Sequence, residues 1–203
     1  MVFNQSGRRA HVSDPVTQWA AALASGMMDV GELAYLAATL AAYPWAHGGI
    51  VVEIGAYAGA TSVFMAKVLR HLGHRVPILS IDPFERAVPG PIDPQGSYAA
   101  YLQTIRAHQV EDLCVPLVAF SKDAAPVVPD SVGVLVVDGG HQYDVVRGDL
   151  SDYGPKVRPG GFVFMDDYSE AFPGVMRAAD EYFVEDGPFT IVHKSYFVVA
   201  ERR

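Results

Sequence analysis

The sequence predicts an α/β fold: a seven-stranded, mostly parallel sheet with helices on both faces and one antiparallel strand. From residue 50 onward, short apolar runs alternate with longer stretches of helical periodicity, a pattern typical of parallel strands joined by crossing helices. Several of these runs are apolar without interruption, as strands buried on both faces are. Near the end, two apolar runs are separated only by Lys194, which indicates a hairpin and therefore one strand that runs against the others.

The first 49 residues differ in character from the rest. Residues 1–14 are polar, and we expect them to form a flexible arm, whereas residues 15–203 make one domain. Within that domain, residues 15–49 make a helical cap and residues 50–203 make the α/β core. Apolar residues recur at helical spacing in the first half of the cap. Asp29-Val-Gly-Glu32 then has the form of a capping box that opens a second helix.

The elements of the core follow from the same two periodicities. One connection is unusually long: Pro83 to Ser97 is rich in proline and glycine, which break regular structure. Because long irregular loops in compact domains tend to be functional, we interpret this loop as a lid over the carboxyl edge of the sheet. Strands are predicted over residues 50–54, 76–81, 113–120, 132–137, 162–166, 189–193 and 195–200, and helices over residues 60–72, 98–108, 143–157 and 175–183.

Composition and charge restrict the class of function. The chain has 203 residues, of which 50% are hydrophobic and 19% charged, as expected of one globular domain. Its formal net charge of −8 argues against nucleic acid or an anionic membrane as a partner, since both attract basic surface. The single cysteine, Cys114, and a start without signal-like character favour a cytoplasmic location. A homodimer is one assembly that the sequence leaves open.

A glycine-rich turn separates the first core strand from its helix, in the sequence Glu53-Ile-Gly55-Ala-Tyr57-Ala-Gly59-Ala-Thr-Ser62. Such a turn lets a ligand approach backbone N–H groups at a helix N-terminus, where Tyr57 is placed to cover it. An ordinary strand–helix turn is the alternative, but a carboxylate such as Glu53 inside an apolar strand is costly to bury without a partner. The spacing is not Gly-x-Gly-x-x-Gly, so a cofactor other than NAD is favoured.

Two further polar residues follow the next strands. Asp82 ends the second core strand, where an acid commonly contacts ribose hydroxyls, and a turn-capping role is the alternative. Ser121 follows the third strand and is a candidate for adenine contact, with a helix N-cap as an equal interpretation. Together with the turn they indicate an adenosine-type site, whose predicted residues are Glu53, Gly55, Tyr57, Gly59, Ser62, Asp82, Ser121 and Asp138.

The most specific pattern is acidic. Asp138-Gly-Gly-His141 follows one apolar run, and the pair Asp166-Asp167 follows the next. Carboxylates where parallel strands end lie at the ligand-binding edge of the sheet, and three of them suit a hard cation such as Mg²⁺ or Mn²⁺. His141 then stands beside the metal as a general base, with a turn histidine bonded to backbone as the alternative. Charged residues on the following helix are interpreted as solvated partners at helical spacing, namely Asp144, Arg147 and Asp149.

With these motifs the chain resembles the class I S-adenosylmethionine-dependent methyltransferases, which implies a Rossmann-like fold and S-adenosylmethionine as cofactor. Asp138-Gly-Gly-His141 and Pro159-Gly-Gly-Phe-Val-Phe-Met-Asp166-Asp167 resemble more narrowly the metal-dependent branch that methylates sugars, such as the mycinamicin and macrocin O-methyltransferases. The resemblance covers residues 50–200 and implies that Asp138, Asp166 and Asp167 hold Mg²⁺ and that His141 is the general base. The chain is also similar, more weakly, to the methyltransferases of mycobacterial methylmannose polysaccharide synthesis.

We therefore expect an O-methyltransferase that acts on a hydroxyl of a glycoside or oligosaccharide, with Tyr168 lining the acceptor pocket. A sugar hydroxyl is a poor nucleophile, and a metal ion that holds its oxygen lowers its pKa, while neutral His141 takes the proton. A phenolic or catechol acceptor is the alternative, although catechol-type enzymes carry an Asp-Asn pair and a lysine base. A non-catalytic cofactor-binding partner protein is disfavoured by the intact base, and an NAD-dependent oxidoreductase by the glycine spacing.

Overall fold

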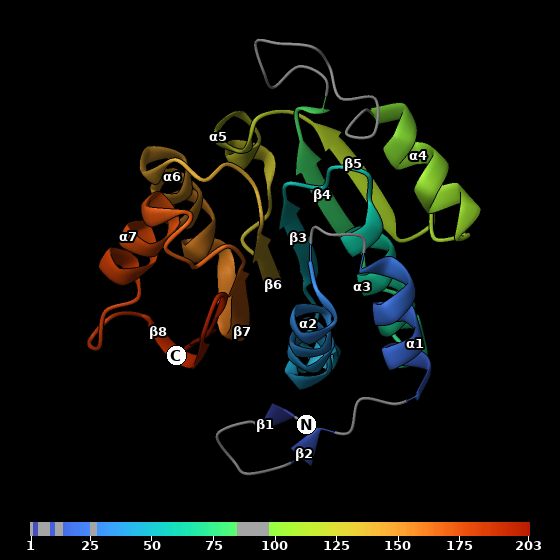
Figure 1. The fold of residues 1–203 in the computed structure, drawn as a ribbon, viewed down its shortest axis with the longest axis horizontal. Helices are drawn as coiled ribbons and strands as arrows, with labels where there is room; N and C mark the ends of the chain where they lie inside the picture. Colours follow the sequence, from blue (N-terminus) through green and yellow to red (C-terminus); the bar gives the residue numbers. More distant parts are fainter. Residues whose placement is uncertain (1, 4–8, 11–13, 25–27, 85–97) are drawn as a thin grey trace.

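A seven-stranded sheet forms the centre of the protein in the computed structural model (Figure 1), which describes residues 2–3, 9–10, 14–24, 28–84 and 98–203. The strand order is β5-β4-β3-β6-β7-β9-β8. Strand β9 pairs antiparallel with both β7 and β8, whereas the pairs from β5 to β7 are parallel, so the predicted sheet with one antiparallel strand is confirmed. The strands are β3 (Ile50–Ile54), β4 (Ile78–Asp82), β5 (Cys114–Val118), β6 (Val132–Val137), β7 (Val157–Met165), β8 (Phe189–Lys194) and β9 (Val198–Arg202).

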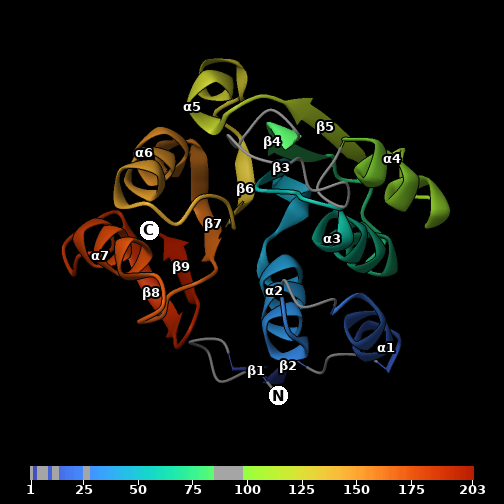
Figure 2. The same cartoon turned by 45° about the horizontal axis from the view of Figure 1, so that its top comes forward.

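Helices cover both faces of the sheet, as the two views show (Figures 1 and 2). One face carries α1 (Asp14–Leu23), α2 (Val30–Ala42), α3 (Ala60–His71) and α4 (Tyr98–Ala107), and the other carries α5 (Ser121–Ala124), α6 (Tyr143–Tyr153) and α7 (Pro173–Tyr182). Short 3₁₀ turns lie at Trp45–His47, Ala125–Val127 and Gly154–Lys156. No helix of the described residues is long and apolar enough to cross a membrane.

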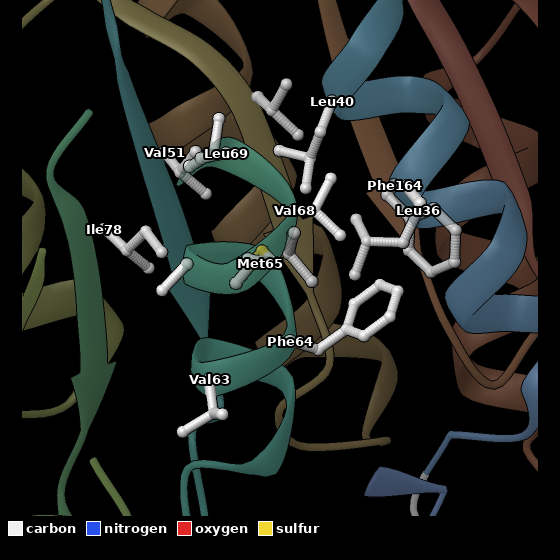
Figure 3. Close-up of a cluster of buried hydrophobic side chains, with 14 of the residues drawn as sticks. Leu36, Leu40, Val51, Val63, Phe64, Met65, Val68, Leu69, Ile78 and Phe164 are labelled. Carbon is white, nitrogen blue, oxygen red and sulfur yellow. The ribbon is translucent and has the colours of Figure 1, made fainter. Parts of the chain in front are cut away.

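The hydrophobic core is divided by the sheet into two layers, because successive strand residues point to opposite faces. Val51 packs in the layer under α1–α4, whereas its neighbour Val52 packs under α5–α7. Figure 3 shows the first layer, in which Phe64 and Val68 of α3 lie beside Leu36 of α2. The uninterrupted apolar character of the strands is therefore a consequence of burial on both faces.

A capping box fixes the start of α2 in the helical cap. Asp29 Oδ1 accepts the N–H of Glu32 at 2.9 Å, and Glu32 Oε2 accepts the N–H of Asp29 at 2.5 Å. This confirms the predicted start of the second helix. In the N-terminal arm, β1 (Val2–Phe3) pairs with β2 (Arg9–Ala10), and the flexibility expected for the arm stays a prediction.

Several local expectations differ from the structure. Strand β7 begins at Val157, five residues before the predicted start at residue 162, and β9 begins at Val198, three residues after the predicted start at residue 195. The helix predicted to residue 157 ends at Tyr153, because Pro155 has no N–H to continue the helical ladder and the chain passes through a 3₁₀ turn into β7. A short helix, α5, follows β5 where no element was predicted, since four residues carry too little periodicity to be recognised.

The carboxyl ends of the parallel strands define one edge of the sheet, and the candidate residues follow these ends. The glycine-rich turn follows β3, Asp82 ends β4, Asp138 follows β6 and Asp166 follows β7. Of the predicted lid, residues 85–97 lie outside the described residues. Phe84, at its start, is buried against the rings of Tyr98 and Tyr101.

Candidate active site

The glycine-rich turn after β3 needs its two glycines for steric reasons. Gly55 has φ 86°, and a Cβ there would lie 2.0 Å from the backbone oxygen of Asp138. Gly59 has φ 83°, and a Cβ there would lie 2.9 Å from the ring of Tyr101. Because only glycine fits both the left-handed backbone and the close approach, the turn passes tightly between the end of β6 and α4.

Asp82, at the end of the neighbouring strand β4, stabilises this turn by hydrogen bonds. Its Oδ2 accepts the N–H groups of Ala56 and Tyr57 at 2.8 and 2.9 Å, and its Oδ1 accepts the N–H of Phe84 at 2.6 Å. These bonds also hold Tyr57 in a left-handed conformation, with φ 44°. The turn-capping role is therefore present, and since each carboxylate oxygen has two lone-pair sites, it is compatible with a ribose contact.

Glu53 lies beneath the turn, where it is completely buried. Its Oε2 accepts hydrogen bonds from Ser62 at 2.5 Å and Ser80 at 2.6 Å, and Tyr101 donates to Ser80 at 3.0 Å. Glu53 Oε1 has no hydrogen-bond partner among the described residues. Burial raises the pKa of Glu53 to about 7. Glu53 and Ser62 thus stabilise the turn from inside the core.

Ser121 begins α5, and Tyr153 of α6 donates its hydroxyl to the Ser121 carbonyl at 2.6 Å. Burial raises the pKa of Asp149, four residues earlier on α6, to about 6, and the nearby Ser121 side chain lowers it. Asp149 is 3% exposed, so the expectation of a solvated residue is wrong. The available signal was its position: Val146 lies three residues before it and Tyr153 four residues after it, and with Leu150 they form the apolar side of α6.

A pocket lies at the ends of β6 and β7 and contains the acidic cluster. It is lined by Asp138, His141, Asp166 and Asp167, together with the glycines between Asp138 and His141 and the side chains of Val137, Val146, Met165 and Val175. Burial and the neighbouring carboxylates Asp166 and Asp167 raise the pKa of Asp138 well above its usual range. Carboxyl groups are therefore concentrated at the sheet edge, where a nearby cation would favour their ionised form.

His141 and Asp167 are paired at this pocket. His141 Nε2 lies 2.8 Å from Asp167 Oδ2, and the two side chains are 42% and 29% exposed. The His141 ring also packs against Phe172, with ring centroids 4.0 Å apart. Asp167 has φ 60°, a left-handed conformation. Since its N–H donates to Asp166 Oδ1 at 2.8 Å, the carboxylate pair is held in a tight local turn.

Glu32, at the start of α2, lies beside Asp166 of the pocket. Burial raises the pKa values of both carboxyl groups, and the neighbouring Glu32 raises that of Asp166 further, whereas the contact with Asp166 lowers that of Glu32. Both residues are buried. The sequence showed Glu32 only as part of a capping box, because nothing in that pattern reveals that the first turn of α2 packs against the end of β7.

The donor chemistry of the pocket fits a hard cation, because carboxylate oxygens are the ligands that Mg²⁺ and Mn²⁺ prefer. The geometry is not preformed: within the described part of the chain, no group of three or more histidine, cysteine, aspartate or glutamate side chains converges closely enough to hold a metal ion. Asp167 is directed instead to His141. Tyr168, predicted to contact the acceptor, donates its hydroxyl to Asp180 at 3.0 Å and does not line the described pocket.

The fold and the arrangement of turn, Asp82 and acidic cluster at one sheet edge define a class I methyltransferase. A family model described as a methyltransferase domain matches residues 52–168. The match spans more than half of the 203 residues, so the chain belongs to this family. This confirms the class that the motifs predicted, whereas the link to mycobacterial polysaccharide synthesis stays a prediction.

Solved structures share the fold. The O-methyltransferase NovP is 23% identical, with a TM-score of 0.70 over 86% of this chain and 80% of that chain. CalS11, a TDP-rhamnose 3'-O-methyltransferase of calicheamicin biosynthesis, is 18% identical, with a TM-score of 0.61 over 95% and 96%. TomG from Streptomyces achromogenes, an O-methyltransferase of tomaymycin synthesis solved with S-adenosylmethionine, is 17% identical, with a TM-score of 0.58 over 97% and 93%. No curated protein sequence matches the chain.

Proposed function

We propose that the protein transfers the methyl group of S-adenosylmethionine to a hydroxyl oxygen of a glycoside or oligosaccharide. The observation that carries the proposal is the pairing of His141 with Asp167 at a pocket that also holds Asp138 and Asp166. A base and a cluster of oxygen ligands side by side are what deprotonation of an alcohol needs. The fold shared with a TDP-rhamnose 3'-O-methyltransferase supports a sugar acceptor.

The cofactor is proposed to lie over the glycine-rich turn, at the ends of β3 and β4. Asp82 is assigned to the ribose hydroxyls, and its bonds to Ala56 and Tyr57 keep the turn in place while it does so. Ser121 is assigned to the adenine. The buried Glu53 and Ser62 act from below, where their hydrogen bond fixes the start of α3. The sulfonium methyl then faces the end of β6, where the pocket lies.

His141 is assigned as the general base. Asp167 Oδ2 lies 2.8 Å from His141 Nε2, and we propose that this contact orients the ring. For the acceptor proton to reach a ring nitrogen, the imidazole must be neutral. Phe172 packs on the ring and excludes water from one of its faces. Asp138, Asp166 and Asp167 would hold a divalent cation, which when bound lowers the pKa of the acceptor hydroxyl. The acceptor oxygen attacks the methyl carbon, its proton passes to the imidazole, and the methyl–sulfur bond breaks with S-adenosylhomocysteine as the leaving group.

The experiment that tests this function is a screen for S-adenosylhomocysteine release. The purified protein is incubated with S-adenosylmethionine and a panel of glycosides, oligosaccharides and catechols, with and without Mg²⁺. Release that depends on both a glycoside and Mg²⁺ supports the proposal. Release with catechols alone, or equal release with every acceptor and with none, contradicts it.

An aromatic acceptor is the second candidate, and Phe172 is the observation that favours it. Its ring lies beside the proposed base, where it would stack on a phenolic acceptor as readily as on the apolar face of a sugar. Phe84 offers no such help, because it is buried against Tyr98 and Tyr101. The catechol arm of the same screen distinguishes the two acceptors.

A further inference from the structure

Helix α7 begins directly against the backbone of the segment that carries His141. A Cβ at Gly174 would lie 2.6 Å from the carbonyl oxygen of His141 and 2.7 Å from the amide nitrogen of Tyr143. Both are backbone atoms, so rotation of a side chain could not relieve such a contact. A hydrogen atom therefore fits between the first turn of α7 and residues 141–143, whereas a methyl group does not.

This close approach alone explains a glycine at position 174. Gly174 is the second residue of α7 and has no positive φ, so its backbone conformation is one that any residue adopts. Glycine lowers the stability of a helix relative to alanine, because it loses more conformational freedom on folding. The loss is accepted at the place where the helix meets the His141 segment.

The turn that precedes Gly174 is connected to both members of the His141–Asp167 pair. The N–H of Ser169 donates to the Asp167 carbonyl at 2.8 Å, and the N–H of Phe172 donates to the Ser169 carbonyl at 2.9 Å. The ring of Phe172 in turn packs on the ring of His141. The position of α7 is therefore linked to the position of each partner.

A surface network holds α7 to the other end of the same segment. Tyr143, two residues after His141, donates its hydroxyl to Glu181 Oε2 at 2.5 Å, and Arg177 Nε donates to Glu181 Oε1 at 2.9 Å. The Arg177 guanidinium also lies 4.0 Å from the centre of the Tyr143 ring. Residues 141–143 thus contact α7 at its first turn and again near its end, so a shift between the two breaks these contacts.

The His141–Asp167 pair tolerates only a small shift. His141 Nε2 lies 2.8 Å from Asp167 Oδ2, and hydrogen bonds from nitrogen to oxygen extend to about 3.2 Å. A Cβ at position 174 reaches ordinary contact with the His141 oxygen at 3.4 Å instead of 2.6 Å, a displacement of 0.8 Å. Because this displacement falls between α7 and residues 141–143, it exceeds what the pair can absorb.

We propose that Gly174 is a positioning residue for the base: without a side chain there, α7 comes close enough to residues 141–143 to hold His141 at hydrogen-bond distance from Asp167. The proposal rests on the proposed function, since it takes His141 as the base. It extends that function, because Gly174 is assigned no contact with cofactor or acceptor and acts only through His141. A side chain at position 174 therefore lowers turnover more than cofactor binding.

The test compares Gly174→Ala with Gly148→Ala. Gly148 lies inside α6, and a Cβ there would meet open space. Alanine at position 148 should raise the thermal unfolding midpoint by about 1–4 °C and leave turnover unchanged. Gly174→Ala should lower turnover of the acceptor by about 10–100-fold, the effect of a reacting group misplaced by about 1 Å. The dissociation constant of S-adenosylhomocysteine should stay within about threefold of wild type in both variants.

A double-mutant cycle separates positioning from a general loss of structure. In a His141→Ala background, Gly174→Ala should cost less than about twofold in turnover, because the group that it positions is already absent. An equal loss in both backgrounds shows a purely structural effect and overturns the inference. A Gly174→Ala variant that keeps more than about half of wild-type turnover overturns it as well.

Two further measurements keep the test decisive. At one fixed pH, the ring-nitrogen magnetic resonance signal of His141 Nε2 should move in Gly174→Ala and stay in place in Gly148→Ala, and an unmoved signal overturns the inference. If Gly174→Ala fails to fold, Tyr143→Phe replaces it: this change removes the bond to Glu181 without adding an atom, and it should lower turnover by at least about threefold. Unchanged turnover there overturns the inference. A wild-type protein without transferase activity contradicts the proposed function instead, and the ring signal still decides whether Gly174 places His141.

Discussion

His141 Nε2 lies 2.8 Å from Asp167 Oδ2, which joins the loop after β6 to the first residues after β7. A histidine bonded to a carboxylate is held in one ring orientation, and its other nitrogen is directed away from that partner. The pair stands at the pocket that contains Asp138 and Asp166. The proposed base and the proposed cation ligands are thus in contact, and Asp167 is assigned to both roles.

Asp167→Asn tests whether Asp167 serves both roles, as the partner of His141 and as a ligand of the cation. The amide keeps the shape of the side chain but removes the charge that pairs with His141, so turnover of the acceptor should fall by roughly 10²-fold, at the lower end of what loss of base function costs. The dissociation constant of S-adenosylhomocysteine should change less than about threefold, since Asp167 is assigned no contact with the cofactor. Steady-state kinetics and calorimetry on the same preparation measure both. Equal losses in turnover and cofactor affinity would place Asp167 in the cofactor site instead.

Glu53→Gln should change how stability depends on pH. The folded-state pKa of Glu53 is raised from 4.5 to about 7, so the folded protein binds the proton more tightly than the unfolded chain does. The stabilisation from that proton is fully present below pH 4.5 and is lost as pH rises through 7. A shift of this size corresponds to roughly 3 kcal/mol in the free energy of unfolding.

Urea unfolding at pH 5 and pH 8 measures the effect. Glutamine is always neutral and its oxygen can accept from Ser62 and Ser80, so the variant should lose less stability than wild type between the two pH values. The other buried carboxyls act with the same sign in both proteins and cancel in the difference. A difference between wild type and variant that is the same at both pH values would show that Glu53 does not titrate in this range.

Asp82→Ala should weaken cofactor binding. It removes the proposed ribose contact and also the acceptor of the Ala56 and Tyr57 N–H groups. Hydrogen bonds to a charged group contribute about 1.5–3 kcal/mol each, so the dissociation constant of S-adenosylhomocysteine should rise by at least about tenfold. Asp82→Asn, which keeps one carbonyl oxygen for the turn, should lose less. Unchanged affinity in Asp82→Ala would move the cofactor to another part of the protein.

A divalent cation should bind at the acidic pocket, and its effect can be seen without turnover. Mg²⁺ at about 100 times its dissociation constant should stabilise the folded protein by about 2.7 kcal/mol, which raises the thermal midpoint by roughly 5–10 °C. Asp138→Asn or Asp166→Asn should remove most of that rise. Asp130→Asn should keep it, because Asp130 is exposed and precedes β6, whereas the pocket lies at the other end of that strand. A full rise in both pocket variants, or full turnover after exhaustive EDTA treatment, contradicts a cation held by these residues.

The sheet could be predicted because burial on both faces leaves a direct trace in the sequence. Strand β3 was predicted over the same residues that form it, since apolar side chains on both layers surround Val51 and Val52. The order of the acidic residues along the strand ends followed in turn, because all parallel strands end at one edge. Local patterns of this kind span only a few residues, so they can be recognised without knowing how distant elements pack.

The side-chain partners at the site were not predictable, because they depend on how elements distant in sequence pack. Asp167 was interpreted only as a cation ligand, and its bond to His141 depends on the left-handed turn that it adopts. Glu32 reaches Asp166 only because α2 packs against the sheet. Asp149 was interpreted as solvated because its side chain is charged. Its place on the apolar face of α6 indicated burial instead.

The most direct measurement of the central claim is the rate of S-adenosylhomocysteine release by His141→Ala with saturating cofactor, Mg²⁺ and an accepted glycoside. General-base catalysis typically contributes about 10²–10⁴-fold, so turnover should fall by that factor. The dissociation constant of S-adenosylhomocysteine should stay within about threefold of wild type, because the imidazole is assigned no cofactor contact. A variant that keeps more than roughly a tenth of wild-type turnover loses less than removal of a base should cost, and it would contradict the assignment of His141 as the base.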